Sequence, residues 1–220
     1  FLIIAISFLG LLVYGQNPVE LQTDYLENPI GLDNHNPRLT WKIDDNRKGA
    51  KQDAYRLIVG VDSLLVNSVN GSTSLIVYKN DAESNNGSND IIWDSGKIDS
   101  EVQLVTYIGA NLNPFTKYYW KVIIWDQNQK ESISDIQTFE TGMMDLSNWQ
   151  GSWISDGRDI NYKAAPYFRK GFKADKEIES ARVYIAVAGL YELHVNGVKI
   201  GNQRLDPMYT RFDRRNLYVT

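Results

Sequence analysis

Hydrophobic and polar residues alternate most regularly between Ala181 and Gly201. Apolar side chains fall at every second position in two runs, first at Val183, Ile185 and Val187, then at Tyr191, Leu193 and Val195. A period of two is typical of a β-strand with one buried side and one solvent-facing side. Asn196-Gly197 follows at once, and this dipeptide favours the positive φ values of a two-residue hairpin turn. The pattern predicts two strands and a hairpin leading into a third.

Short alternating runs also fill residues 17–142, where no stretch of ten residues or more has a helical period. The expected strands centre on these apolar positions: Leu39, Trp41 and Ile43; Tyr55, Leu57, Val59 and Val61; Ile91 to Trp93; Tyr118, Trp120, Val122 and Ile124; and Phe139. Turn residues separate the runs, which favours a β-sandwich of the immunoglobulin or fibronectin type III kind. Residues 112–118 have the L-x-P-x-T-x-Y spacing of fibronectin type III domains, so Tyr118 is predicted to form a tyrosine corner.

Residues 147–220 are expected to form a second β-unit, which begins near Trp149. Strands are predicted over 167–172, within 181–201 and over 217–220, with a loop over 205–210 between the last two. About five strands are too few to close a two-sheet sandwich and would leave an apolar face uncovered. We therefore expect this sandwich to be incomplete and the natural chain to continue beyond Thr220.

The first 15 residues are almost wholly apolar, and the run is too short to span a bilayer. A short apolar run followed by modest side chains before Gln16 favours a signal peptide, with a buried strand or a membrane anchor as the alternative. The mature protein is then expected to be periplasmic or secreted, with no stable membrane span.

The segment between Asn67 and Asp90 is polar and is predicted to be a surface loop. Its alternating acceptors, Asp81, Glu83 and Asn85, suggest calcium, but Asn86 stands where the EF-hand pattern needs glycine. A solvated loop is the better interpretation.

Composition excludes several classes of function. The chain is 43% hydrophobic, enough for a sizeable core, and its net charge is −4 without a run of basic residues, so nucleic acid is not an expected partner. Cysteine is missing, which excludes disulfides, thiolate metal sites and a cysteine nucleophile.

No catalytic constellation can be recognised among the polar residues. The two histidines, His35 and His194, belong to different predicted domains, so no metal site is expected from them. Among the 27 acidic residues, Asp94 and Asp126 precede turn sequences and are interpreted as turn formers rather than as acids. No carboxylate has the apolar sequence setting that would raise its pKa for general acid catalysis.

Several motifs follow one another along the chain: Asn36 to Trp41, Gln52 to Val59, Trp93 to Lys97, Tyr118 to Asp126, Trp153-Ile154, Phe168 to Lys170, Ala188 to Gly197, and Leu205, Pro207, Thr210 and Arg215. Taken in this order, they resemble the bacterial α-L-rhamnosidases of glycoside hydrolase family 78. The resemblance implies an all-β chain, with a fibronectin type III-like sandwich over 17–142 and an incomplete jelly-roll sandwich over 147–220. It also implies an inverting hydrolase that removes terminal α-L-rhamnose from plant glycosides or polysaccharides. The family's catalytic carboxylates lie on an (α/α)6 barrel, so catalytic residues are expected beyond Thr220 and none in this chain.

In some members of the family the second domain binds rhamnose together with a calcium ion, so calcium is a possible ligand of residues 147–220. Asn196, Asp206 and Tyr209 are the candidate sugar-binding residues, because amide and carboxylate groups bind vicinal hydroxyls and a tyrosine ring stacks on a sugar face. The alternatives are turn geometry for Asn196 and ordinary loop packing for Asp206 and Tyr209. A non-catalytic pair of carbohydrate-binding or adhesive sandwiches is the alternative function.

Overall fold

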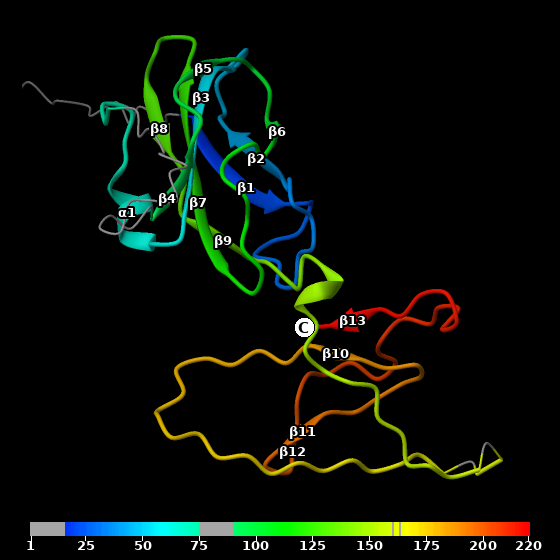
Figure 1. The fold of residues 1–220 in the computed structure, drawn as a ribbon. Coiled ribbons are helices and arrows are strands. Elements are labelled where there is room, and N and C mark those ends of the chain that lie inside the picture. Colours follow the sequence, from blue (N-terminus) through cyan, green and yellow to red (C-terminus); the bar gives the residue numbers. More distant parts are fainter. Residues whose placement is uncertain (1–15, 75–89, 160, 163) are drawn as a thin grey trace, which may run out of the picture. The chain divides into compact units, whose positions relative to one another are not determined.

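The computed structural model describes residues 16–74, 90–159, 161–162 and 164–220 (Figure 1). The chain divides into two units, one ending at Met144 and the other covering Asp145–Thr220, and each is described by itself. The predicted signal peptide over 1–15 lies outside the described residues. So do the acceptors Asp81, Glu83 and Asn85 of the predicted loop.

The first unit contains two antiparallel sheets. The smaller sheet has the order β1–β2–β6, and the larger has the order β4–β3–β7–β8, with β5 paired to β3 and β9 to β7. The strands are β1 (Asn17–Thr23), β2 (Arg38–Asp44), β3 (Gln52–Gly60), β4 (Ile91–Asp94), β5 (Ile98–Asp99), β6 (Leu104–Thr106), β7 (Lys117–Asp126), β8 (Glu131–Ile133) and β9 (Gln137–Glu140). The predicted all-β class is confirmed, because the one α-helix among the described residues, α1 (Ser63–Ser68), is six residues long.

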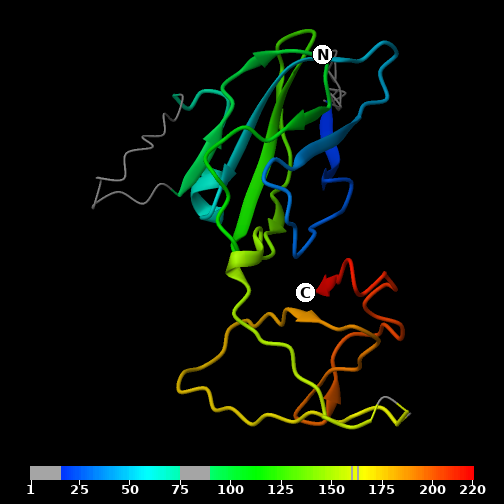
Figure 2. The same ribbon diagram turned by 45° about the vertical axis from the view of Figure 1, so that its right-hand side comes forward.

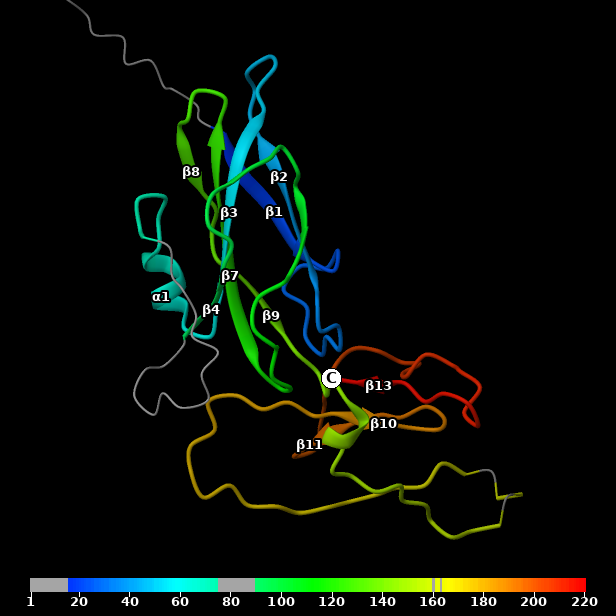
Figure 3. The ribbon, with the colours of Figure 1, turned by 45° about the horizontal axis from the view of Figure 1, so that its top comes forward.

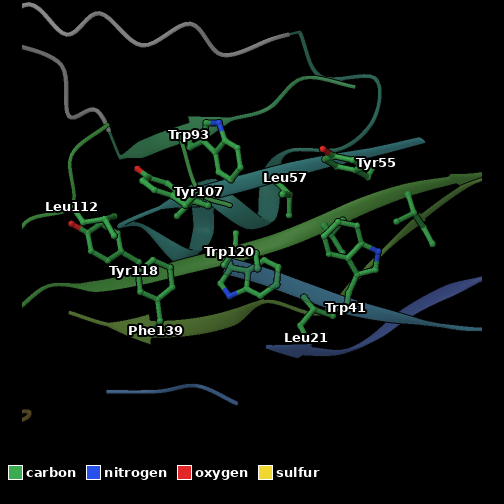
Figure 4. Close-up of a cluster of buried hydrophobic side chains, with 14 residues drawn as sticks. Leu21, Trp41, Tyr55, Leu57, Trp93, Tyr107, Leu112, Tyr118, Trp120 and Phe139 are labelled. Atoms are coloured by element: carbon green, nitrogen blue, oxygen red, sulfur yellow. The ribbon is translucent and has the colours of Figure 1, made fainter. Parts of the chain in front are cut away.

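The inner faces of the two sheets form the main core (Figure 4). Leu21, Leu39 and Trp41 from the smaller sheet and the alternate apolar residues of β3 and β7 are buried there. The Tyr118 and Phe139 rings stack with centroids 5.1 Å apart. The alternation in the sequence therefore marks the side of each strand that faces the other sheet.

Both faces of β3 and β7 are buried, whereas the alternation predicted one wet face. Ala54, Ile58 and Ile123 form a second cluster with Val66 of α1. Figures 1 and 3 show α1 on the side of the larger sheet away from β1 and β2. Asp62 caps the N-terminus of this short helix, and its carboxylate accepts hydrogen bonds from the N–H groups of Leu64 and Leu65.

The tyrosine corner predicted at Tyr118 is confirmed. Its hydroxyl accepts a hydrogen bond from the Asn113 N–H at 2.7 Å, and its side chain is buried. The bond crosses the turn that leads into β7 and fixes the direction in which that strand starts. The alternation did not indicate β1, β5, β6 and β8, which are short or lie at sheet edges with mixed polar sequences.

The second unit has only short strands (Figure 2). Two two-stranded sheets pair β10 (Ile185–Ala186) with β13 (Tyr218–Val219) and β11 (His194–Val195) with β12 (Val198–Lys199). The strand expected over 167–172 is not formed, and Tyr167, Phe168 and Phe172 are exposed. Pro207 is the sole buried residue among the described part of this unit, so its apolar side chains have no core to anchor longer strands.

Candidate functional site

The β11–β12 hairpin organises the candidate site in the second unit. Val195 pairs with Val198, so two residues form the turn, and Asn196 and Gly197 have φ values of 51° and 83°. Both values are positive, as a type I′ turn requires, and the predicted turn is confirmed. Asn196 is exposed at the tip, where its backbone conformation by itself explains why an asparagine stands there.

Charged side chains gather on one face of this hairpin. Lys199 donates a hydrogen bond to Glu192 at 2.7 Å and is the cross-strand partner of His194. The Nε2 atom of His194 lies 3.6 Å from the other Glu192 oxygen. The hydrogen bond from Lys199 lowers the pKa of Glu192, which therefore stays ionised at neutral pH. Glu192 and His194 share a face because they are two positions apart, and the two-residue turn at Asn196-Gly197 brings Lys199 opposite His194.

Asp206 lies next to Tyr191, the first residue of the second predicted strand. The Tyr191 N–H donates to the Asp206 carbonyl at 3.1 Å. Burial, and then the negative charge of Asp206, raise the pKa of the Tyr191 hydroxyl. The loop carrying Asp206 is thus attached to the chain just before the hairpin.

Tyr209 has one of the most exposed aromatic rings of the chain, with 80% of its surface accessible. Its one described ring contact is an edge contact with Phe212, with centroids 5.3 Å apart. Exposed tyrosine rings are suited to stacking on the apolar face of a sugar.

Within the described part of the chain, no hydrogen bond, ion pair or ring contact joins Asn196, Asp206 and Tyr209. Nor do the described residues bring three His, Cys, Asp or Glu side chains together as a metal site. Each candidate residue offers suitable chemistry for sugar hydroxyls. The described contacts therefore do not define a preformed pocket around the three residues.

Two family descriptions match the chain in sequence order. The one for the Rha78A-like, N-terminal immunoglobulin domain matches residues 18–145, and the one for the alpha-L-rhamnosidase N-terminal domain matches residues 176–220. A protein of Formosa agariphila named alpha-L-rhamnosidase is 31% identical over 216 residues, which is 87% of this chain and 21% of that protein. An Alteromonas protein of the same name is 29% identical, over 86% of this chain and 20% of its own length.

Solved structures agree with these matches. The α-L-rhamnosidase from Dictyoglumus thermophilum superposes with a TM-score of 0.75 and 36% identity, over 92% of this chain and 23% of that one. The Streptomyces avermitilis α-L-rhamnosidase, whose structure is a complex with L-rhamnose, gives a TM-score of 0.52 and 29% identity over 64% of this chain and 12% of its own.

The sandwich and the unit that follows it define the class, which is the N-terminal β-region found in α-L-rhamnosidases. The chain belongs to the family of Rha78A-like N-terminal immunoglobulin domains. It spans about a fifth of the length of the curated relatives it matches. Among the described residues, no helix combines the length and the hydrophobicity of a membrane span.

Proposed function

We propose that this chain is the N-terminal, non-catalytic region of a secreted or periplasmic α-L-rhamnosidase. The observation that carries the proposal is the order of the two matched domains, since both belong to the N-terminal regions of proteins with that name. The parent enzyme removes terminal α-L-rhamnose from plant glycosides or polysaccharides with inversion. Its paired carboxylates belong to a catalytic domain beyond Thr220.

In this proposal the second unit contacts the rhamnose-containing substrate through Asp206 and Tyr209, with Asn196 at the hairpin tip. The exposure of Tyr209 and the acceptor groups of the other two residues support it. Calcium in this unit stays a prediction. Asp206 and Asn196 offer the hard oxygen ligands that calcium takes, but the described residues do not bring three His, Cys, Asp or Glu side chains together, so no step is assigned to an ion.

Hydrolysis of p-nitrophenyl α-L-rhamnopyranoside by the full-length protein tests the proposal. We expect turnover by the full-length protein, with β-L-rhamnose as the first product detected by NMR, and none by the 220-residue chain. Lack of turnover of this substrate and of natural rhamnosides would refute the assigned activity. Turnover by the 220-residue chain would refute its non-catalytic role.

A pair of sandwiches that binds carbohydrate without catalysis is the second candidate, and the exposed Tyr209 ring favours it. Calorimetry with L-rhamnose on residues 16–220, with and without calcium, distinguishes the two. Binding here, together with an inactive full-length protein, would support the second candidate, whereas silence in both titrations would count against it.

A further inference from the structure

An open hollow lies at one end of the first unit, on the larger sheet. About 550 Å³ of space is lined by Asp53, Lys97, Asp99 and Gln129. Asp53 comes from the start of β3, Lys97 and Asp99 from β5 and the residues before it, and Gln129 from the turn between β7 and β8. These elements meet because β3 pairs with both β5 and β7.

The walls of the hollow are fixed by hydrogen bonds. The Ser100 N–H donates to the Asp53 carbonyl at 2.8 Å. In the turn, the Gln129 N–H donates to the Asp126 carbonyl at 2.8 Å. The Asp126 carboxylate also accepts from the Asn128 and Lys130 N–H groups at 2.8 and 2.9 Å. The four lining side chains therefore project from a rigid backbone frame.

The lining groups include both hydrogen-bond donors and acceptors. Lys97 donates to the side-chain oxygen of Gln129 at 2.7 Å, which leaves the Gln129 NH₂ group without an acceptor among the described residues. Asp53 is paired with Lys51 at 3.2 Å. Neither carboxylate oxygen of Asp99 accepts a hydrogen bond from another residue of the described ranges, although Asp99 lines the hollow. Two residues that line the hollow thus carry an acceptor and a donor that no described residue satisfies.

An aromatic ring lies beside these polar groups. The Lys97 ammonium stands 4.6 Å from the centroid of the Trp125 ring, and Lys97 itself is exposed. The ring is buried, and a long, exposed lysine side chain covers one of its faces. A ligand that displaced Lys97 would gain an indole face to stack on.

The charges of the lining select the class of ligand. Asp53 and Asp99 would repel a phosphate or a carboxylate, while the ammonium groups of Lys97 in the lining and of Lys51, the ion-pair partner of Asp53, oppose a divalent cation. A hydroxyl group both donates and accepts, so a neutral sugar satisfies the open Asp99 and Gln129 groups at once. We propose that this hollow on the immunoglobulin-like unit binds neutral sugar residues of a glycan, separately from the second unit. The choice of glycan rests on the function proposed above.

The test is an NMR titration of the ¹⁵N-labelled 220-residue chain with rutinose, a disaccharide of rhamnose and glucose. We expect a saturable, millimolar shift of the Trp125 indole and Gln129 side-chain signals. Asp99→Ala should weaken this binding about tenfold, the loss expected for a hydrogen bond to a charged group. Glu20→Ala, an exposed acidic residue of β1, and Asp206→Ala in the second unit should leave these shifts unchanged.

Failure to saturate, or equal binding by Asp99→Ala, would overturn the proposal. A response of the two signals to calcium chloride but not to rutinose would overturn it in favour of a cation site. Rhamnosidase turnover by the full-length protein is read separately. Turnover without rutinose-induced shifts of these NMR signals would refute only the sugar site proposed in the hollow. Such shifts without turnover would refute only the proposed activity of the parent enzyme.

Discussion

The buried ion pair between Arg56 and Asp94 gives the sharpest test of what holds the first unit together. The guanidinium donates to the two carboxylate oxygens at 2.8 and 2.6 Å, and both side chains are almost fully buried. Arg56 also donates to the carbonyls of Asn70, Thr73 and Ser74. This residue therefore ties β4 and the segment after α1 to the sheet.

Replacing Asp94 with asparagine keeps the shape of the side chain but removes the carboxylate charge from the buried pair. Removing one partner of a buried pair costs about 3–5 kcal/mol. Because the three carbonyls still solvate Arg56, we expect about 3 kcal/mol, near the lower end of that range. With a urea m-value of about 1.5 kcal/mol/M, the unfolding midpoint should fall by about 2 M.

Urea unfolding followed by tryptophan fluorescence measures this change, because Trp41, Trp93, Trp120 and Trp125 are all buried in the first unit. Glu20→Gln is the matched control, since it removes an exposed pair with Lys42 and should leave the midpoint unchanged. A double-mutant cycle with Arg56→Met separates the pair from the carbonyl contacts of Arg56.

A free energy of unfolding for Asp94→Asn within about 1 kcal/mol of the parent value would refute the reasoning, because removing one partner of a buried pair is expected to cost more. A cycle with no coupling between the two substitutions would refute it too. In that case the carbonyls, and not the carboxylate, would account for the stability that Arg56 gives.

Four further predictions can be checked by the same kinds of measurement. Tyr118→Phe should lower the free energy of unfolding by about 1 kcal/mol, because the Asn113 N–H loses its acceptor; an unchanged urea midpoint would argue against a stabilising corner. Gly109→Ala should lower the free energy of unfolding by about 1–3 kcal/mol in thermal or urea unfolding, since an added Cβ would lie 2.5 Å from the Cβ of Trp93. Wild-type stability would mean that the backbone around Gly109 and Trp93 shifts to make room for the methyl group. The hydrogen bond from Arg47 lowers the pKa of Asp45 from its ordinary value of 3.8. The stability that the Arg47–Asp45 pair provides should therefore be complete above pH 3.8 and be lost as the pH falls through the lower folded-state pKa of Asp45. In Arg47→Leu the free energy of unfolding should fall less steeply at acid pH, and an identical acid dependence in the two proteins would contradict this expectation. Residues 147–220 expressed alone should show no cooperative thermal transition by circular dichroism, because none of their described large apolar side chains is buried. A cooperative melt would show the prediction to be wrong.

Most features of the fold that could be predicted from the sequence are local motifs. The Asn196-Gly197 turn and the tyrosine corner at Tyr118 each depend on residues within a few positions, so their sequence patterns are specific. The interpretation of Asp94 and Asp126 as turn formers is also confirmed, because Asp94 accepts from the Gly96 N–H and Asp126 from the Asn128 and Lys130 N–H groups.

The candidate site was predictable only residue by residue. Asn196, Asp206 and Tyr209 were chosen for their chemistry, and sequence spacing carries no information about whether three loop side chains converge. The neighbours that the structure gives them, Tyr191 beside Asp206 and Phe212 beside Tyr209, depend on how the loops fold back.

Sequence alone determined the β-class of the chain and the turns, because a period of two and the conformational preferences of Asn-Gly act locally. Tertiary structure decided which charges are buried and what they contact. Arg56 meets Asp94 across 38 residues, and Arg47 meets Asp126 across 79. The same pairing of β3 with β5 and β7 brings the four residues of the hollow together. Contacts of this kind follow from strand order and register, which the packing of the whole sandwich selects and no local pattern encodes.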